Sequence, residues 1–410
     1  MEETSNVPKL RFKEFTDEWE KLPAGKIFRS ISNKHHSNEK LPILAVTQDQ
    51  GVLDRDLLDL RINSNKKNLD SYKLVEPGDF IISLRSFQGG IEYSYIKGLC
   101  SPAYTVLKPK IPISDEFFKL YLKKENFISR LNSAVIGIRD GKQISFSVFS
   151  EIMIPYTSVH EQNKLSLFVS SIDMKLNCLE KKLQYLNYFK KYCLQNLFSD
   201  KSKLRFKEFN GSDFGDKNEF KTVKFESLIK KGKAGGTPKS SIERYYKGNI
   251  PFLSISDMTK QGKYITFTSK QITKEAIEDS SAWIIPKNSL LYSIYASIGF
   301  VSINRINLST SQAIFGIILK DKVNINYIYY YLIYFKRFVH NFIETGTQGN
   351  LNKNILYNFN IKIPNSIEEQ TKIATFLSVI DKKLDLTQKQ IDLMEKFKKG
   401  LLQQMFVYLY

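Results

Sequence analysis

A repeated unit of about 200 residues constrains the fold of this chain more than any other feature of its sequence. The heptapeptide KLRFKEF occurs at residues 9–15 and again at 203–209, an offset of 194. Residues 161–198 and 369–406 align without gaps at an offset of 208, with 16 identities in 38 positions. Because both matches keep their order, the sequence predicts two related units and not a short-period solenoid.

Each unit ends in a stretch that has the pattern of a long helix with one apolar seam. Apolar residues follow one another in steps of three and four, and the matching residues Lys190 and Lys398 interrupt the two series. This spacing predicts a coiled coil. The seam positions are Leu165, Val169, Ile172, Leu176, Leu179, Leu183, Leu186, Cys193 and Leu197 in the first helix, and Ile373, Leu377, Ile380, Leu384, Thr387, Ile391, Met394, Leu401 and Met405 in the second.

A helix of 38 residues, about 57 Å long, cannot bury such a seam by itself. Since both seams have the same length and the same interruption, we expect the two helices to pair with each other, antiparallel about a pseudo-two-fold axis. The alternative is that each seam binds another protein. A proline followed by Ser-x-x-Glu, at 158–161 and 366–369, predicts a capping box at the start of each helix.

The blocks that precede the helices combine short strands with shorter helices. Strand-like runs lie at 80–84, 103–107, 250–255, 289–294 and 313–319, and helical stretches near 115–132 and 325–343. Residues 75–91 and 101–109 correspond in pattern to 284–301 and 310–320, although their side chains differ. We therefore predict an α+β fold, with two mixed α/β domains separated by two long antiparallel coiled-coil helices in a pseudo-two-fold internal repeat. If the repeat closes on itself, residues 9–15 lie near Phe406 at the end of the second helix.

The formal net charge of +19 indicates a polyanionic partner, with nucleic acid ahead of an anionic membrane surface. Of this excess, +12 falls within residues 202–364 and only +3 within 1–155. The chain has no run of about 18 apolar residues, so a membrane span is not expected. Its polar, acidic start is unlike a secretory signal, and its three cysteines lack disulfide or metal-ligand spacing. We expect a cytoplasmic protein with reduced thiols.

Signatures of catalysis are missing from the sequence. The chain contains no Pro-Pro pair, and so no Asp/Asn-Pro-Pro-aromatic methyltransferase motif. No glycine-rich loop has the spacing of a nucleotide site, and the four histidines lack the spacing of a zinc site. We therefore expect no cofactor, no metal and no catalytic residue.

Three features together resemble the specificity subunit of type I restriction-modification systems. They are the run GGTPKSSIERYYKGNIPFLSISDM at 235–258, the helix start EEQTKIATFLSVIDKKLD and the two-block layout. The resemblance covers nearly the whole chain, but the first block has RSISNKHHS at 29–37 where GGTPKS stands in the second.

The resemblance implies that 1–155 and 201–364 are target recognition domains, and that 156–200 and 365–410 are spacer helices. Each domain would read one half of a split sequence in double-stranded DNA. Two modification subunits would dock on the helices, restriction subunits would join through them, and all catalysis would belong to these partners. From the residues alone, a spacer between two unlike domains likewise predicts a bipartite, asymmetric target with half-sites about one helical turn apart.

Polar and basic residues at strand ends and in loops are the candidates for DNA contact, because Arg, Gln, Asn, Ser and Thr read base edges and Lys binds phosphate. In the first block they are Arg85, Ser86, Gln88, Arg139, Lys142 and Gln143. In the second block they are Lys231, Lys233, Gly235, Gly236, Thr237, Lys239, Ser293, Tyr295, Thr347, Gln348, Asn350 and Lys353. Two other functions stay open: a coiled-coil scaffold that presents two protein-binding domains, and a standalone DNA-binding regulator.

Overall fold

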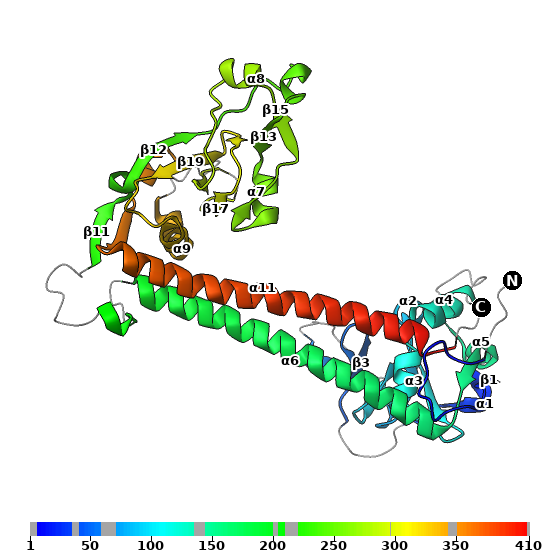
Figure 1. Cartoon of the computed structure of the whole chain (residues 1–410). Coiled ribbons are helices and arrows are strands. Elements are labelled where there is room, and N and C mark those ends of the chain that lie inside the picture. The colour runs from blue at the N-terminus through cyan, green and yellow to red at the C-terminus, as the bar shows by residue number, and fades with distance from the viewer. Residues whose placement is uncertain are drawn as a thin grey trace. The chain divides into compact units, whose positions relative to one another are not determined.

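The computed structural model describes residues 6–34, 41–58, 71–134, 144–199, 204–209, 220–295, 297–342 and 351–407. The chain forms two compact units, the first made of Met1–Glu180 with Gln390–Tyr410 and the second of Lys181–Lys389. The boundary passes through two long helices, α6 (Val159–Phe198) and α11 (Ile367–Gln404), drawn in green and red in Figure 1. Each unit therefore holds the start of one long helix and the end of the other.

The first unit is built on an antiparallel sheet with the strand order β2-β9-β6-β7. These strands are β2 (Phe28–Ile31), β6 (Phe80–Ile82), β7 (Glu92–Tyr93) and β9 (Thr105–Pro109). Three antiparallel pairs surround it: β1 (Glu20–Pro23) with β10 (Met153–Tyr156), β3 (Leu44–Thr47) with β4 (Gly51–Asp54), and β5 (Lys73–Val75) with β8 (Gly98–Cys100). The helices are α1 (Ala24–Ile27), η1 (Arg55–Leu57), α2 (Ser86–Gly89), α3 (Asp115–Tyr121), α4 (Glu125–Ala134) and α5 (Phe146–Glu151).

The second unit repeats this plan with a larger sheet, in the order β12-β19-β16-β17-β14. Its strands are β12 (Ile229–Ala234), β14 (Tyr264–Ile265), β16 (Leu290–Ser293), β17 (Val301–Asn304) and β19 (Ile314–Leu319). A second sheet contains β13 (Ile250–Leu253), β15 (Lys270–Ile272) and β18 (Ser309–Thr310), and β11 (Phe220–Lys224) pairs with β20 (Asn360–Pro364). The helices are η3 (Lys207–Phe209), η5 (Phe225–Leu228), η6 (Glu243–Tyr246), α7 (Ile255–Gln261), α8 (Lys274–Glu278), α9 (Ile325–Phe335), η7 (Lys336–Phe342) and α10 (Lys353–Tyr357).

The strand orders confirm the internal repeat. β2, β9, β6 and β7 of the first unit occupy the same order as β12, β19, β16 and β17 of the second. In both units the first strand pairs antiparallel with the strand that leads into a long helix, β1 with β10 and β11 with β20. The predicted strands exist as β6, β9, β13, β16 and β19, and the helical stretches as α3 with α4 and α9 with η7.

Within each unit α6 and α11 run antiparallel. In the first unit Leu165, near the start of α6, shares the core with Leu401, near the end of α11. In the second unit Leu197, at the end of α6, shares the core with Ile373, at the start of α11. Every predicted seam residue is buried or half-buried. In each unit, seam residues from both long helices therefore share a core with the strands of the sheet.

The two lysines that interrupt the seams have matching partners. Lys398 binds Asp173 across the helices of the first unit at 2.5 Å, and Lys190 binds Asp381 in the second unit at 2.6 Å. Both members of each pair lie at equivalent positions of the repeat, at the offset of 208. The interruption predicted from the sequence is thus a cross-helix ion pair formed once in each unit.

The two copies of KLRFKEF make the same contacts. Leu10 donates its backbone N–H to Gln404 O at 3.0 Å, and Leu204 donates to Asn196 O at 3.4 Å, so each copy lies beside the end of a long helix. This confirms that the chain returns to residue 10 at the end of α11. The remaining contacts also repeat: Arg11 with Glu161 and Arg205 with Glu369, Phe12 with Phe168 and Phe206 with Phe376, and Glu14 with Lys164 and Glu208 with Lys372.

Only half of each predicted capping box forms. Ser158 Oγ and Ser366 Oγ accept the N–H groups of Glu161 and Glu369, at 3.3 and 3.2 Å. The carboxylate of each glutamate instead accepts both Nε–H and NH2 of an arginine, Arg11 or Arg205, at 2.7–2.9 Å. A charge-assisted bidentate pair is stronger than a second backbone cap, which explains the choice.

Candidate nucleic-acid interface

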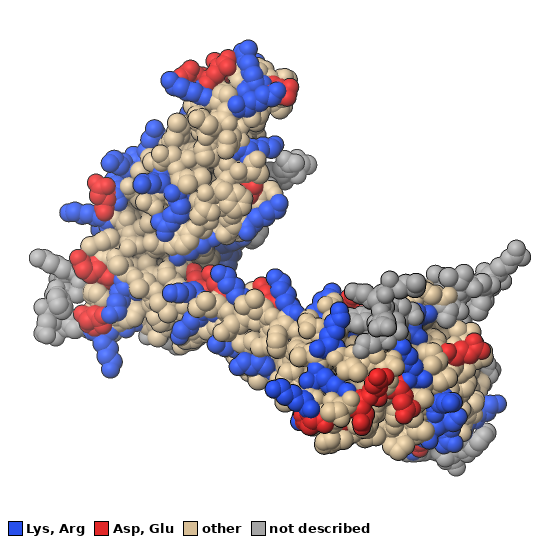
Figure 2. Space-filling view, turned by 45° about the vertical axis from the view of Figure 1, so that its right-hand side comes forward, with Lys and Arg blue, Asp and Glu red and all other residues tan. Residues whose placement is uncertain are grey.

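The edge strand β12 of the five-stranded sheet in the second unit presents the lysines that the sequence singles out. Lys231 and Lys233 are exposed, and Lys231 Nζ lies 4.9 Å from the centre of the Trp283 ring. No described acidic side chain forms an ion pair with either lysine. Figure 2 shows further Lys and Arg side chains spread over this unit. These positive charges fit a phosphate-binding surface.

The glycines of the loop that follows β12 do not have the phosphate-binding role that we expected. Gly235 and Gly236 are buried, and their N–H groups donate to Ile314 O at 2.9 Å and Thr310 O at 3.0 Å. A Cβ at Gly235 would lie 2.2 Å from Thr310 Oγ1, and a Cβ at Gly236 would lie 2.3 Å from Ser281 Oγ. The glycines are thus required for packing, and the predicted contact of their amides with phosphate is not favoured, because those amides already have partners.

Thr237 and Lys239 are the exposed part of this loop. The Thr237 hydroxyl forms a hydrogen bond with the Gln312 side chain, which places an amide of the β18–β19 connection beside it. Sequence reasoning missed Gln312, because it is adjacent to Thr237 only through the pairing of distant segments. Together these side chains offer donors and acceptors next to the lysines of β12.

The two candidates for DNA contact at the end of β16 differ in burial. Ser293 is fully buried, whereas Tyr295 is 44% exposed. The following turn contains Ser297 with φ of 56°, a left-handed conformation that is uncommon for a residue other than glycine. Of the two candidates, only Tyr295 can meet a ligand without rearrangement.

Lys353 belongs to the same surface as β12. It begins α10, is exposed, and its Nζ lies 4.9 Å from the Tyr357 ring centre. Tyr357 donates its hydroxyl to Gly232 O at 3.2 Å, between the two lysines of β12. The fold therefore brings Lys353 to residues 120 positions earlier in the chain. Thr347, Gln348 and Asn350 lie outside the described residues.

In the first unit, the candidates for DNA contact at the end of β6 also differ in burial. Arg85 and Gln88 are exposed, and Ser86 is fully buried, with its Oγ accepting the N–H of Ser83 at 2.9 Å. Ser86 is therefore placed to shape the turn and not to touch DNA. Arg139, Lys142 and Gln143 lie outside the described residues.

The described residues hold no group of three or more His, Cys, Asp and Glu side chains that could bind a metal ion. Cys100, Cys178 and Cys193 are free, and burial raises the pKa of Cys100 to about 12. Among the described helices, none is long and apolar enough to cross a membrane.

Comparison with known proteins finds similarity to type I specificity subunits. Residues 217–396 match the family described as the type I restriction modification DNA specificity domain. The chain is 31% identical over 205 residues to the type I restriction enzyme MjaIX specificity subunit of Methanocaldococcus jannaschii, covering 49% of this chain and 47% of that protein. Within residues 217–396, the chain is therefore similar to the DNA specificity domain of type I systems. The chain spans about half the length of this relative.

Solved structures agree with this family in fold. The specificity subunit of a type I system from M. genitalium covers 98% of this chain and 100% of its own, with a TM-score of 0.56 and 15% identity. A chain from work on complex assembly and conformational transition of the type I system covers 95% of this chain and 97% of its own, with a TM-score of 0.57 and 13% identity. The α+β fold with paired long helices is thus the fold of type I specificity subunits.

Proposed function

We propose that this chain is a specificity subunit that reads a bipartite, asymmetric DNA sequence and has no catalytic centre of its own. Residues 1–155 and 201–364 would act as target recognition domains, one for each half-site, in the cytoplasm where the DNA lies. One observation carries the proposal: the two units share a strand order and a set of anchoring contacts but carry different side chains at equivalent strand ends. Arg85 follows β6 where Ile294 and Tyr295 follow β16. We therefore expect the two surfaces to prefer different bases.

We further propose that the long helices dock modification subunits, through which restriction subunits join. The support is an exposed apolar face on α6 in addition to its buried seam. Tyr185, Tyr188, Phe189 and Tyr192 lie at positions i, i+3, i+4 and i+7 and are 69, 60, 47 and 53% exposed. A helix face of this kind is suited to a partner helix. The equivalent positions of α11 are Leu393, Lys396, Phe397 and Gly400, so two copies of a partner would meet related surfaces.

Mapping of methylated adenines tests the recognition. Cells that carry this chain with its modification partner should methylate a single sequence made of two unlike halves and an unread middle. The purified complex should bind that DNA with a strong dependence on salt, since phosphate contacts release counterions. Methylation without a split consensus, or no salt-dependent binding, would contradict the proposal and favour a protein scaffold.

Docking is tested by removing aromatic rings from the exposed face of α6. Tyr188→Ala with Tyr192→Ala should weaken binding of the modification subunit at least about tenfold, because aromatic residues commonly dominate such contacts. Lys191→Ala, an exposed change between the two tyrosines, is the control. Equal binding by all three proteins would exclude this face.

A further inference from the structure

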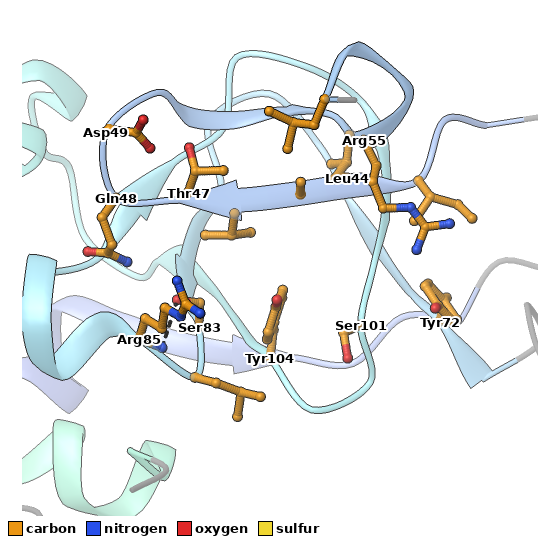
Figure 3. A pocket seen from close by; sticks show the side chains of 15 residues that line it. Leu44, Thr47, Gln48, Asp49, Arg55, Tyr72, Ser83, Arg85, Ser101 and Tyr104 are labelled. Carbon is orange, nitrogen blue, oxygen red and sulfur yellow. Dashed lines mark hydrogen bonds between the residues drawn. The ribbon is translucent and has the colours of Figure 1, made fainter. Parts of the chain in front are cut away.

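A hollow of about 520 Å³ opens beside the end of β6 in the first unit (Figure 3). The hairpin β3–β4, the start of η1, the end of β6 and the segment before β9 form its walls. Its polar side chains include Thr47, Gln48, Arg55, Tyr72, Arg85 and Tyr104. Figure 3 shows Gln48 and Arg85 at one end of the hollow and Arg55 and Tyr72 at the other. Its volume lies within the range of about 300–1,000 Å³ that is typical of ligand sites.

The turn after β6 holds Arg85 toward this hollow. Ser83 N–H donates to Ser86 Oγ at 2.9 Å, and Arg85 N–H donates to Ser83 Oγ at 3.3 Å. Both serines are buried, so the turn has a defined conformation. The Arg85 side chain is exposed and has no hydrogen-bonded or ionic partner among the described residues. None of its five donors is used by another residue that the structure describes.

Gln48 lies at the same end of the hollow, and its side-chain amide lacks hydrogen-bond partners among the described residues. Its Oε1 and Nε2 are both buried, and neither has a hydrogen-bond partner in the described structure. The amide packs on Gly89, where an added Cβ would lie 1.5 Å from Oε1. A buried amide without partners is costly, so rotation of Gln48 onto a ligand that offers one donor and one acceptor would be favourable.

From this arrangement we infer that Arg85 and Gln48 read base edges in the half-site bound by the first unit. The inference rests on the proposed function and deepens it. An arginine fork matches the O6 and N7 acceptors of guanine, and a glutamine amide matches the N6 donor and N7 acceptor of adenine. Two such groups side by side recognise adjacent purines in the major groove. Ser86 acts as a positioning residue for Arg85.

The composition of the hollow favours bases over phosphate alone. Asp49 lines the same end, and a carboxylate there repels a phosphate group but can accept a hydrogen bond from a cytosine amino group. Leu44, Val46 and Leu84 add apolar surface, which suits base edges and the thymine methyl group and not a phosphate. Arg55, at the opposite end of the hollow, would bind a phosphate group of the DNA backbone.

The experiment compares Arg85→Lys, Arg85→Ala and Gln48→Ala in the complex of the full chain with its modification subunit. One readout is the consensus of methylated sites in cells, and the other is competition between target DNA and DNA with single base changes in each half-site. Arg29→Ala and Asn132→Ala remove an exposed guanidinium and an exposed amide of the same unit away from the hollow, and serve as controls. Arg85→Lys keeps the charge, which retains phosphate binding but not the bidentate contact.

We expect Arg85→Lys and Gln48→Ala each to relax one position of one half-site, with discrimination against the wrong base falling about 5- to 150-fold. The other half-site and both control variants should keep the original consensus. An unchanged consensus in Arg85→Lys, with affinity lowered equally on all sequences in Arg85→Ala, would identify a phosphate contact and overturn the inference. Absence of any split consensus with the unaltered chain would instead overturn the proposed function itself.

Discussion

Arg11 and Arg205 make the same contact in the two units and show what the repeated heptapeptide is for. The Arg11 guanidinium binds Glu161 within a buried site, where Trp19 Nε1 and Thr157 Oγ1 also donate to the carboxylate, at 3.1 and 2.5 Å. The side chains of Arg11 and Glu161 are 10% and 1% exposed. KLRFKEF therefore attaches the chain to the start of a long helix in each unit.

Loss of one partner of this pair should be severe. Arg11→Ala leaves Glu161 charged and buried, so the free energy of unfolding should fall by about 3–5 kcal/mol. Lys164→Ala, which breaks the exposed pair with Glu14, should cost no more than about 1 kcal/mol. Chemical denaturation of the three proteins measures both effects, and similar stabilities for the two variants would contradict this account.

The lowered pKa of Lys124 predicts how the free energy of unfolding depends on pH. Burial lowers the pKa of Lys124 to about 8, while its Nζ donates to Leu402 O at 2.9 Å beside the Phe406 ring. In the unfolded chain a lysine titrates near about 10.4. Between these values the unfolded state binds the proton and the folded state does not, so the contribution of Lys124 to stability rises from about pH 8 to about pH 10. Below pH 8 Lys124 is protonated in both the folded and the unfolded state. Burial of its charge then lowers the free energy of unfolding by the full amount.

Lys124→Met removes this contribution. The stability of the unaltered protein relative to the variant should therefore rise by up to about 1.4 kcal/mol per pH unit within that window. Urea unfolding at pH 7 and pH 10 measures the difference. Lys399→Met, at an exposed position of α11, should show no such trend. A pH-independent difference for Lys124→Met would show that its pKa is ordinary.

At the scale of the elements, the ion pairs across α6 and α11 set the register of the helices. An apolar seam alone tolerates a shift by one heptad, whereas Lys190 with Asp381 specifies one alignment. Asp381 also accepts the Tyr330 hydroxyl at 2.5 Å, which joins helix α9 of the second unit to this pair. In the first unit, the equivalent ion pair is formed by Lys398 and Asp173.

Exchange of these charges tests the role in register. Lys190→Glu should destabilise the second unit, because it places two carboxylates together, and Lys190→Glu with Asp381→Lys should recover about 1 kcal/mol in a double-mutant cycle. Lys191→Glu changes an exposed neighbour and controls for the altered helix charge. A coupling energy of zero would mean that the seam specifies the register without the ion pair.

At the scale of the whole molecule, the chain is a closed repeat. Leu10 is bound to Gln404 as Leu204 is bound to Asn196, so the junction between the last and first elements equals the internal junction after α6. The break between the termini is then only one of two equivalent positions at which the chain can begin.

A circular permutant follows from this equivalence. A chain that begins at Lys201, with residue 410 joined to residue 6 by a short flexible linker, should fold with a free energy of unfolding within about 1–2 kcal/mol of the natural chain, since all described contacts are kept. Circular dichroism with denaturation measures this. A chain opened inside β16 by the same procedure should not fold, and comparable stability of the two permutants would contradict the interpretation.

Sequence patterns alone determined the repeat, the two long helices, their antiparallel pairing and the resemblance to type I specificity subunits. These depend on periodic burial and on identity between the copies, which are properties of the string itself. The roles of individual site residues were less predictable. Ser86, Ser293, Gly235 and Gly236 have the types expected at an interface, yet they are buried and largely committed to the packing of their own turns.

Tertiary structure decided which polar side chains face outward and which distant residues meet. Lys353 lies next to β12 because Tyr357 binds Gly232, and Gln48 lies beside Arg85 because a hairpin folds over the end of β6. No local pattern encodes such neighbours, since they arise from pairing between segments tens of residues apart. The repeat in the sequence therefore determines the scaffold, and the arrangement of the loops on it determines where DNA can be read.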